Sequence, residues 1–567
     1  MSVASVNITS NGTNISAEYE LLYIDVKTEY NRIPYAELGF IGGDLPRQEY
    51  RISESPDFEP GKEIEIKIGY TNSSPANKPQ VVFKGIVLKQ SLQMNESGCI
   101  LIAELSDAAI KMTAGRKSNV FENIKDNEII KKLIENSGLK VGTVEIEENE
   151  RTVVVPAVDS TNVQHKKIVQ YAATNWDFML SRAEANGLLV SVKAGVISAK
   201  APKLTGAITA TYTVGIDDIY DFNLEADGRN QFAEITGASW DAKKQELTTP
   251  NKAKNFSLQQ GNFKPATIAK AVGGQSDVLL SATSLETEET QAWADAKMIK
   301  SRLSFLRGRF KIPGDATIEV GNLIKIVGVG LRFSGQTLVT GVRHYYGLNG
   351  WTTDIQFGLA ADWFAAQPNV TDLKASGLLP GVNGLQIGVV EKWEEDPDKE
   401  YRVKVKIPAI NSDKGILWSR LITPWGGKEA GIFFQPDPGD EVIIGFLNDD
   451  PRQPVILGSV HSSANPSPLK PAEKNPEKGI VTKEGIKILL NDENKLLTIQ
   501  TSDKNTIIIN DKDKIIEIKD ANNNIIKLSS DGITLDSGKD VIIKAKGGIK
   551  MQASAKVEIK GSEIDIT

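Results

Sequence analysis

The sequence predicts a mainly β protein with an α+β amino-terminal part, a small OB-fold barrel and a carboxy-terminal triple-stranded β-helix in a homotrimer. Three observations support this fold class. Stretches in which apolar and polar residues alternate run through much of the chain, a compact group of them lies between residues 385 and 461, and aliphatic pairs repeat regularly after residue 480. Alternation with a period of two is typical of strands that bury one face.

Composition excludes several classes of protein. The 567 residues are enough for roughly three or four domains. A net charge of −7 and the lack of a basic stripe argue against nucleic acid as a partner. No run of 18 apolar residues predicts a membrane helix, and the first residues show neither a charged nor an apolar signal region. The single cysteine, Cys99, excludes a disulfide framework within one chain.

Residues 1–375 are the first predicted domain, a β-rich unit with helical insertions. Residues 63–68 alternate strictly, as a half-buried strand does. Gly138 and Gly187 are expected to end two helices. We predict strands at 63–68, 81–88, 98–105, 188–192 and 196–199, helices at 126–137, 163–186 and 286–305, and further strands across 316–357.

A second domain is predicted at residues 385–461, after a boundary rich in Pro and Gly at about 366–384. The number of short strands suits a Greek-key barrel of the OB type. The expected strands are Gln386–Lys392, Tyr401–Ile407, Leu417–Leu421, Gly431–Gln435, Glu441–Leu447 and Val455–Val460. Residues 462–479 follow as a stiff, proline-rich linker.

The last predicted domain, residues 480–567, is a repeat. No Phe, Tyr or Trp follows Phe446, and aliphatic pairs recur with turn-forming residues between them. Near the end the interval becomes eight residues. The predicted needle core is the set of paired positions Ile533 and Leu535, Val541 and Ile543, Ile549 and Met551, and Val557 and Ile559.

An octad repeat of this kind favours three intertwined chains over one. A single chain winding all three sides of a prism would make a stub of ~15 Å, at ~4.8 Å per layer. Three chains that each supply one side per layer would make a rod of ~50 Å from the same residues. The missing aromatic rings suit a narrow threefold core. An ordinary β-meander is the alternative, but a meander more often contains aromatic residues and does not keep strict octads.

The end of the chain predicts a tip that needs a cap. The last aliphatic pair, Ile564 and Ile566, is followed directly by Thr567. A blunt end of this kind leaves strand edges and apolar side chains uncovered. We therefore expect these three residues to bind a separate protein. The outer face is charge-balanced, with 14 Lys and 14 Asp or Glu in residues 481–567, and it predicts a solvated surface rather than a ligand site.

Several segments resemble the valine–glycine-repeat spike proteins of type VI secretion and their relatives in phage tails and extracellular contractile injection particles. The order and spacing of the motifs, which span nearly the whole chain, make the resemblance specific. The matching segments are Trp176–Gly187 (DF-x-x-x-R followed by Glu and Gly), Glu319–Ile324, Phe333–His344, Tyr401–Pro408 (YRVKVKIP), Trp418–Arg420, Pro424–Gly427, Pro438–Val442 and Asp450–Gly458.

The resemblance implies a hub-like double barrel at residues 1–375, whose trimer would form a pseudo-sixfold ring. That ring would meet the hexameric inner tube and baseplate proteins, and a conical cap protein of the PAAR type would sit on the needle tip. The protein would assemble in the bacterial cytoplasm without a signal peptide and be ejected as part of the particle, touching the target membrane only transiently. Tyr401 replaces the usual Gly, and the shaft is rich in Ile rather than Val-Gly.

No catalytic, cofactor or metal site is predicted, and we do not expect an enzyme. His165, His344 and His461 lie far apart in the sequence, without Cys or carboxylates at ligand spacing. The acidic residues between 437 and 450 are typical of turns. For Trp418 and Trp425, packing in the core or contact between protomers is favoured over sugar binding.

Two alternatives remain open on the sequence alone. The chain could be a trimeric adhesin, similar to a tail fibre, whose OB barrel binds glycans. It could also be a type VI secretion spike that delivers effectors, although the absence of an effector extension slightly favours an extracellular particle. A peptidoglycan hydrolase is disfavoured because no spare domain could hold a carboxylate pair.

Overall fold

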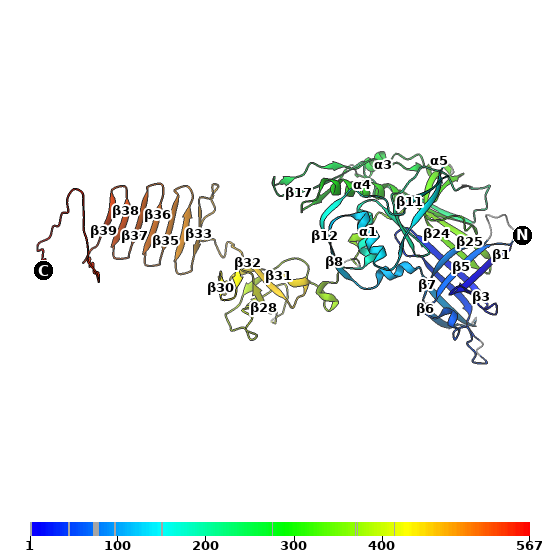
Figure 1. Ribbon diagram of the computed structural model, residues 1–567, viewed down its shortest axis with the longest axis horizontal. Helices are drawn as coiled ribbons and strands as arrows, with labels where there is room; N and C mark the ends of the chain where they lie inside the picture. The colour runs from blue at the N-terminus through cyan, green and yellow to red at the C-terminus, as the bar shows by residue number, and fades with distance from the viewer. Residues whose placement is uncertain are drawn as a thin grey trace. The chain divides into compact units, whose positions relative to one another are not determined.

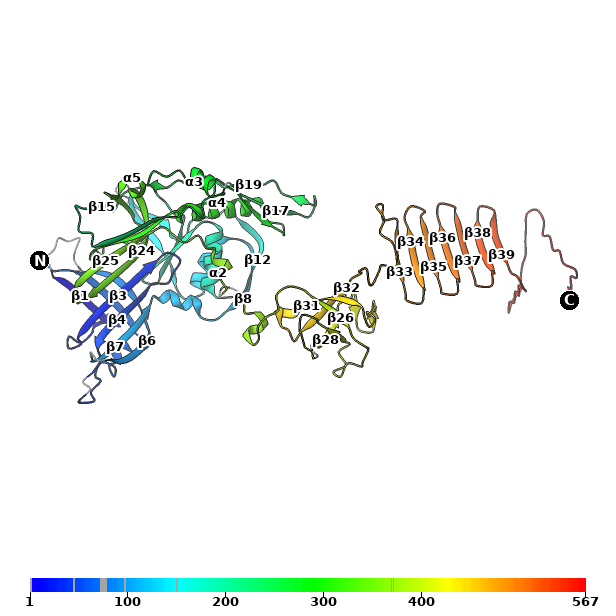
Figure 2. The same ribbon diagram turned by 180° about the vertical axis from the view of Figure 1, so that it is seen from behind.

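A computed structural model describes residues 3–43, 46–71, 79–95, 98–148, 151–274, 276–368, 370, 372–412 and 414–566. The chain divides into two compact units, Met1–Leu373 and Lys374–Thr567. Strands dominate both units, as Figures 1 and 2 show, and the mainly β prediction is confirmed. Among the described residues, no helix has the length and apolarity to span a membrane.

One sheet of fourteen strands organises the first unit. Its main path joins the amino-terminal strands to strands from residues 306–357. The junction is the antiparallel pair β3 and β24, in which Ile24 lies opposite Tyr346 and Glu29 lies opposite Gly341. In path order the strands are β16 (Asp221–Ala226), β22 (Leu306–Pro313), β25 (Gly350–Phe357), β24 (Gly335–Gly347), β3 (Leu21–Glu29), β4 (Tyr35–Ile41), β7 (Gly98–Ser106), β6 (Gln80–Asn95), β5 (Glu63–Tyr70), β1 (Ala4–Ser10) and β2 (Thr13–Asn14). Beside this path lie β15 (Ala210–Thr213), β20 (Gln259–Gln260) and β23 (Leu323–Val327).

Each half of this sheet buries its own core. On β5 the predicted alternation is present, since Ile64, Ile66 and Ile68 are fully buried between more exposed charged residues. These side chains pack with residues of β3, β4 and β7 in one cluster. A second cluster joins β22–β25 around Phe310, Ile324 and Ile355.

An α/β insertion lies between the two halves. Its helices α1 (Asp126–Glu135) and α2 (Asn175–Ala185) pack in a core of their own. The insertion strands are β8 (Lys117–Lys125), β9 (Lys140–Val141), β10 (Thr143–Glu148), β11 (Arg151–Pro156), β12 (Gln164–Ala173), β13 (Leu189–Lys193) and β14 (Val196–Lys200). The short helix predicted at 126–137 is confirmed as α1.

The helix predicted at residues 163–186 is wrong in its first half. Residues 164–173 form β12, which pairs with β8 along most of its length. The helix begins only at Asn175, because the side chain of Thr174 caps it by accepting a hydrogen bond from the backbone N–H of Asp177. Mixed three- and four-residue spacings could not distinguish a strand followed by a helix from one continuous helix.

A third group of elements surrounds the long helix α4 (Thr287–Leu303), as predicted at residues 286–305. It packs on β17 (Glu234–Asp241), where Gly237 allows close approach: a Cβ there would lie 2.6 Å from the carbonyl oxygen of Thr290. The neighbouring elements are β18 (Glu246–Leu247), β19 (Asn251–Lys252), α3 (Pro265–Ala271), β21 (Ser276–Ser281) and α5 (Gly330–Phe333).

The second unit begins with a closed five-stranded barrel (Figure 1). Its strands are β26 (Gln386–Val390), β27 (Val403–Lys406), β28 (Ile416–Leu421), β32 (Pro454–Ser459) and β31 (Glu441–Phe446), in that order around the barrel. Valine and isoleucine fill its core. The strand predicted at 431–435 is not part of the barrel. Gly426, Gly427 and Gly431 instead let the chain turn sharply into a separate hairpin, β29 (Gly426–Gly427) and β30 (Ala430–Gly431).

After the barrel the chain forms a seven-stranded antiparallel sheet, here called the shaft sheet. Consecutive strands lie side by side in both ribbon views (Figures 1 and 2). They are β33 (Glu477–Val481), β34 (Lys487–Asn491), β35 (Leu496–Gln500), β36 (Thr506–Asn510), β37 (Ile515–Lys519), β38 (Ile525–Ser529) and β39 (Gly532–Asp536). Among the residues described after Asp536, none belongs to a strand.

Candidate functional site

The shaft sheet has one aliphatic face that the chain leaves uncovered. Two columns of side chains cross its strands on this face, and Lys478 is the only residue in them that is not Ile or Leu. The first column is Ile480, Ile488, Ile499, Ile507, Ile518, Ile526 and Leu535; the second is Lys478, Leu490, Leu497, Ile509, Ile516, Leu528 and Ile533. On strands β33 to β38, the aliphatic side chains of this face that count as exposed have exposed fractions of 37–47%.

The pairing inside the shaft sheet differs from the intertwined winding predicted for residues 480–536. Each strand pairs with the next strand of the same chain, for example Ile507 with Ile518. The physical reason lies in the connections. Between β33 and β38 they are four or five residues long, as at 492–495 and 501–505, and they are rich in Asn, Asp and Lys. Such connections reverse the chain in a hairpin.

The octad segment after Asp536 behaves differently. Its described residues form no strand pairing. The eight predicted needle-core residues lie on β39 and along this segment, and their side chains have exposed fractions of 52–75%. Their role in a needle core therefore stays a prediction. The backbone N–H and C=O groups of a buried needle must be paired, so the predicted needle implies strand partners from other chains.

The predicted tip lies at the end of this segment. Ile564 and Ile566 are exposed. Thr567, the third predicted tip residue, lies outside the described residues. The binding of a cap to this end remains a prediction.

In the first unit, the helix segment that carried part of the family resemblance is α2. Thr174 and Asp177 cap its beginning, and Gly187 follows its end with φ +68°. Glu184 forms an ion pair with Lys300 of α4. These motif residues therefore cap α2 and join it to its neighbours.

Arg182 of α2 belongs to a buried ion-pair network. The carboxylate of Asp126, at the beginning of α1, is fully buried and accepts hydrogen bonds from Arg182 Nε (2.6 Å) and Nη2 (2.9 Å). Asn186 Nδ2 donates a third bond (2.8 Å), and His165 Nε2 lies 3.1 Å from Asp126. Glu289 of α4 is 3.6 Å from Arg182. The network joins α1, α2, β12 and α4.

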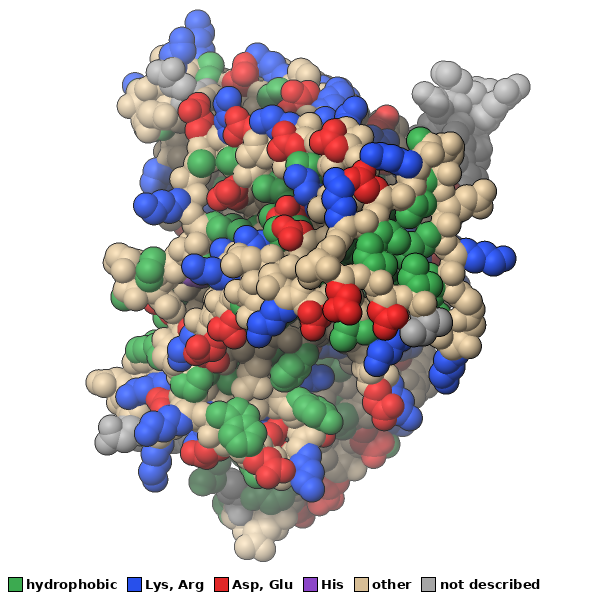
Figure 3. Space-filling model, turned by 90° about the vertical axis from the view of Figure 1, so that its left-hand side faces the viewer, with side chains coloured by type: hydrophobic (Ala, Val, Ile, Leu, Met, Phe, Trp, Pro, Cys, Tyr) green, Lys and Arg blue, Asp and Glu red, His purple; other side chains and the backbone are tan. Residues whose placement is uncertain are grey.

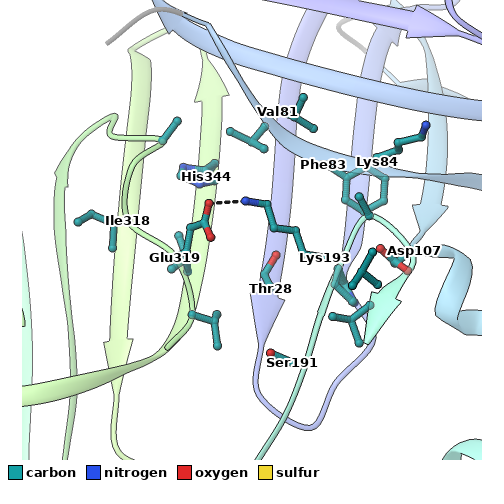
Figure 4. Close-up of a pocket in the computed structure, with 18 of the residues that line it drawn as sticks. Thr28, Val81, Phe83, Lys84, Asp107, Ser191, Lys193, Ile318, Glu319 and His344 are labelled. Carbon is teal, nitrogen blue, oxygen red and sulfur yellow. Dashed lines mark hydrogen bonds and ion pairs between the residues drawn. The ribbon is translucent and has the colours of Figure 1, made fainter. Parts of the chain in front are cut away.

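A cavity of about 470 Å³ lies between β6, β24 and the β13–β14 hairpin (Figure 4). Aliphatic and aromatic side chains such as Phe83 and Ile318 make up much of its wall. The side chains of Lys193 and Glu319 meet across it, with Nζ 2.5 Å from Oε1. These two charges satisfy each other, and the buried carboxylate of Asp107 in the cavity wall accepts hydrogen bonds from the backbone N–H groups of Ala109 and Gly195. His344 contributes to the wall and is buried.

His344 gives a testable pH dependence. Burial lowers the pKa of His344 to about 4, against a smaller opposing effect of Asp315, while its Nδ1 lies 3.0 Å from Thr353 Oγ1. The unfolded chain takes up this proton near pH 6.5, so the stability that His344 contributes is complete above pH 6.5 and is lost as the pH falls toward 4. The difference corresponds to roughly 3 kcal/mol.

Urea unfolding of the wild type and of His344→Gln at pH 7 and pH 4.5 measures this effect. The wild type should lose more unfolding free energy than the variant over this interval, by about 2–3 kcal/mol. Replacing the exposed His461 by Gln is the matched control and should leave the wild-type pH dependence unchanged. Equal pH dependence in wild type and His344→Gln would contradict the assignment.

The remaining residues that the sequence singled out are dispersed. Asp450 pairs with Arg452 in a turn of the barrel. Trp418 lies under the ammonium of Lys404, whereas Trp425 is exposed. No group of three or more potential metal ligands occurs among the described residues. Positive and negative side chains are interspersed on the face drawn in Figure 3.

Two structural features do not follow from the sequence prediction. The sequence predicts Asp126 only as the start of a helix, although an Asp in a first helical turn is a common sign of a capping or paired carboxylate. The exposure of Phe433 and Phe434 contradicts their assignment to a barrel strand. The glycines flanking that segment were the available signal.

Matches to known families divide the chain in the order of these parts. Residues 1–347, more than half of the chain, match the family described as Alg8 N-terminal domain. The chain belongs to this family. Residues 386–461 match the type VI secretion system/phage-baseplate injector OB domain, and residues 496–567 match the phage baseplate V C-terminal trimerisation domain. The two matches to injector and baseplate domains, together with the VgrG relatives described next, confirm the predicted VgrG-like, phage hub–spike type of protein.

Individual relatives match over shorter stretches. The type VI secretion system spike protein VgrG3 of Vibrio cholerae is 38% identical over 96 residues, which cover 16% of this chain and 9% of the relative. VgrG1b of Pseudomonas aeruginosa is 29% identical over 200 residues, 32% of this chain and 27% of the relative. The chain thus matches less than a third of the length of either relative.

A solved structure, that of the E. coli c3393 protein, a component of the type VI secretion system, is 12% identical with a TM-score of 0.41. The match covers 80% of this VgrG-like chain and 99% of the E. coli chain.

Proposed function

We propose that three copies of this VgrG-like chain form the central spike of a contractile injection machine. The observation that carries the proposal is the uncovered aliphatic face of the shaft sheet. An apolar face of this length is unfavourable in water and is stabilised when it is covered. Three such sheets, each turning its aliphatic face inward, make a closed three-sided prism.

The octad segment supports the same stoichiometry. Its described residues have no strand pairing with other described parts of the chain, yet the segment repeats an aliphatic pair every eight residues. Three chains that wind around one another supply both the missing backbone partners and the apolar core. The match of residues 496–567 to a family described as a trimerisation domain agrees with this arrangement.

The proposed partners follow the order of the chain. The amino-terminal unit serves as the hub that meets the hexameric inner tube and baseplate proteins. The end marked by Ile564 and Ile566 binds a PAAR-type cap protein. The spike assembles in the bacterial cytoplasm, leaves with the injection particle, touches the target membrane transiently and binds no nucleic acid. Its role is mechanical: it contributes stiffness and a narrow tip, while sheath contraction supplies the energy.

Multi-angle light scattering of the purified full chain tests the stoichiometry. We expect a single species at three times the 61.7 kDa chain mass, unchanged on dilution, because the aliphatic faces leave no stable monomer. A species at the monomer mass would refute the proposed spike.

A further inference from the structure

The barrel carries two exposed apolar surfaces that do not cover each other. The first, here called the aromatic hairpin, comprises Trp425, Phe433 and Phe434 with the flanking Ile422 and Ile432. The three rings have exposed fractions of 61%, 75% and 63%. Single exposed apolar residues are ordinary, but a cluster of aromatic residues within one short segment is typical of protein interfaces.

The aromatic hairpin is an ordered element. The backbone N–H of Ile432 donates to the carbonyl of Trp425 (2.9 Å), and the hydroxyl of Thr423 donates to the carbonyl of Ile432. Gly431 has φ +149°, and a Cβ there would lie 2.5 Å from the carbonyl oxygen of Trp425, so only glycine fits. The rings are therefore displayed by a defined backbone.

The second surface, here called the aliphatic stripe, crosses the outer face of β26, β31 and β32. It comprises Leu385, Ile387, Val389, Ile443 and Leu457, of which all but Ile443 are exposed. Gly445 lies within it and leaves a shallow notch. A Cβ at this position would contact both Leu385 and Leu457 at 3.6 Å.

We propose that the aromatic hairpin of one barrel packs on the aliphatic stripe of the barrel in a second copy of this chain, with an aromatic ring seated over Gly445. The contact is heterologous, since two different surfaces meet, and a threefold rotation closes such contacts into a ring. This inference rests on the proposed trimeric spike and adds the surfaces by which its barrels recognise one another.

The chain itself favours a second copy as the occupant. Residues 460–476 connect the barrel to the shaft sheet and span at most roughly 60 Å. Three barrels tied to one shaft by such segments meet at an effective concentration in the millimolar range. At that concentration a modest apolar contact is occupied, and the apolar surfaces of both partners leave water together.

Cross-linking in the full-length chain tests the contact. In the variant Phe433→Cys/Leu457→Cys, a short bis-maleimide should join neighbouring copies, and denaturing gels should show a covalent trimer as the main product. Native Cys99 is buried and should not react. The matched control pairs Phe433→Cys with Glu395→Cys, an exposed position in the loop between β26 and β27, and should give at least fivefold less trimer.

A second variant fills the notch. Gly445→Leu, added to the cysteine pair, should reduce the cross-linked trimer several-fold while light scattering still reports three chains, because the shaft is untouched. Gly445 does not have positive φ, so leucine introduces no backbone strain.

The outcomes separate the two proposals. A trimeric mass without cross-links between 433 and 457, or with cross-links only inside single chains, overturns the barrel contact and leaves the spike standing. Cross-linking that persists at full yield in Gly445→Leu also overturns it. A monomeric mass refutes the spike and the barrel contact together.

Discussion

Replacing Ile543 by Asp is expected to abolish assembly of the needle. Threefold symmetry places three copies of residue 543 in one narrow layer, so one substitution introduces three carboxylates. Burying each unpaired charge costs several kcal/mol, and the carboxylates also repel one another. The needle should lose its thermal stability and any resistance of the trimer to SDS, while the untouched shaft sheet (residues 477–536) still holds three chains together.

The neighbouring residue provides a matched control. Ile542 is the same amino acid one position earlier and falls outside the octad series, so in a needle strand its side chain would point to the opposite side from Ile543. Ile542→Asp should therefore keep the wild-type thermal stability and SDS resistance, whereas Ile549→Asp should behave like Ile543→Asp. Equal thermal stability of the wild type and both octad variants would refute a buried threefold core.

Removing the carboxylate of Asp126 is expected to have the second largest effect, within the first unit. Asp126→Ala leaves the guanidinium of Arg182 without its bidentate partner in a largely buried position. Breaking a buried pair on one side costs about 3–5 kcal/mol. Urea unfolding should show this loss.

An exposed ion pair serves as the control. Glu286 pairs with Lys166 at 3.0 Å, and both side chains are mostly exposed. Glu286→Ala should cost less than about 1 kcal/mol, because solvent screens the pair. A cost of similar size for Asp126→Ala would show that the network around Arg182 contributes little to stability.

The pH dependence distinguishes this network from His344. Burial favours the protonated form of Asp126, but hydrogen bonds from His165, Arg182 and Asn186 outweigh it and hold the pKa of Asp126 well below 3.8. A lowered carboxyl pKa contributes stability above 3.8, which is lost only as the pH falls further. The difference between wild type and Asp126→Ala should thus stay constant from pH 7 to pH 5, while the effect of His344 already develops.

Elements with a strong local pattern were predictable. Residues 63–68 form a strand because their alternation places Ile64, Ile66 and Ile68 on one face and the charged residues between them on the other. The barrel core is likewise made of residues from predicted strands, such as Val405, Val442 and Ile456. Hydrophobic periodicity is a property of adjacent residues, so one sequence is enough to reveal it.

Elements whose identity depends on distant partners were not predictable. Residues 164–173 form a strand because β8, about 45 residues earlier, offers them an edge to pair with. Asp126 and Arg182 are 56 residues apart, and neither local segment indicates the other. Phe433 and Phe434 are apolar enough for a core strand, yet the glycine-bounded hairpin keeps them outside the barrel.

By itself, the sequence determined the octads, the aliphatic composition of the shaft and the family motifs, because each depends on residue types at short, regular intervals. Only the tertiary structure decided which strands pair with one another through backbone hydrogen bonds. It showed that residues 477–536 pair within one chain, leaving an aliphatic face uncovered, and that the octad segment pairs with nothing in its own described chain. The reason is that strand pairing depends on connection length and on the free energy of the whole sheet, which a local pattern does not contain.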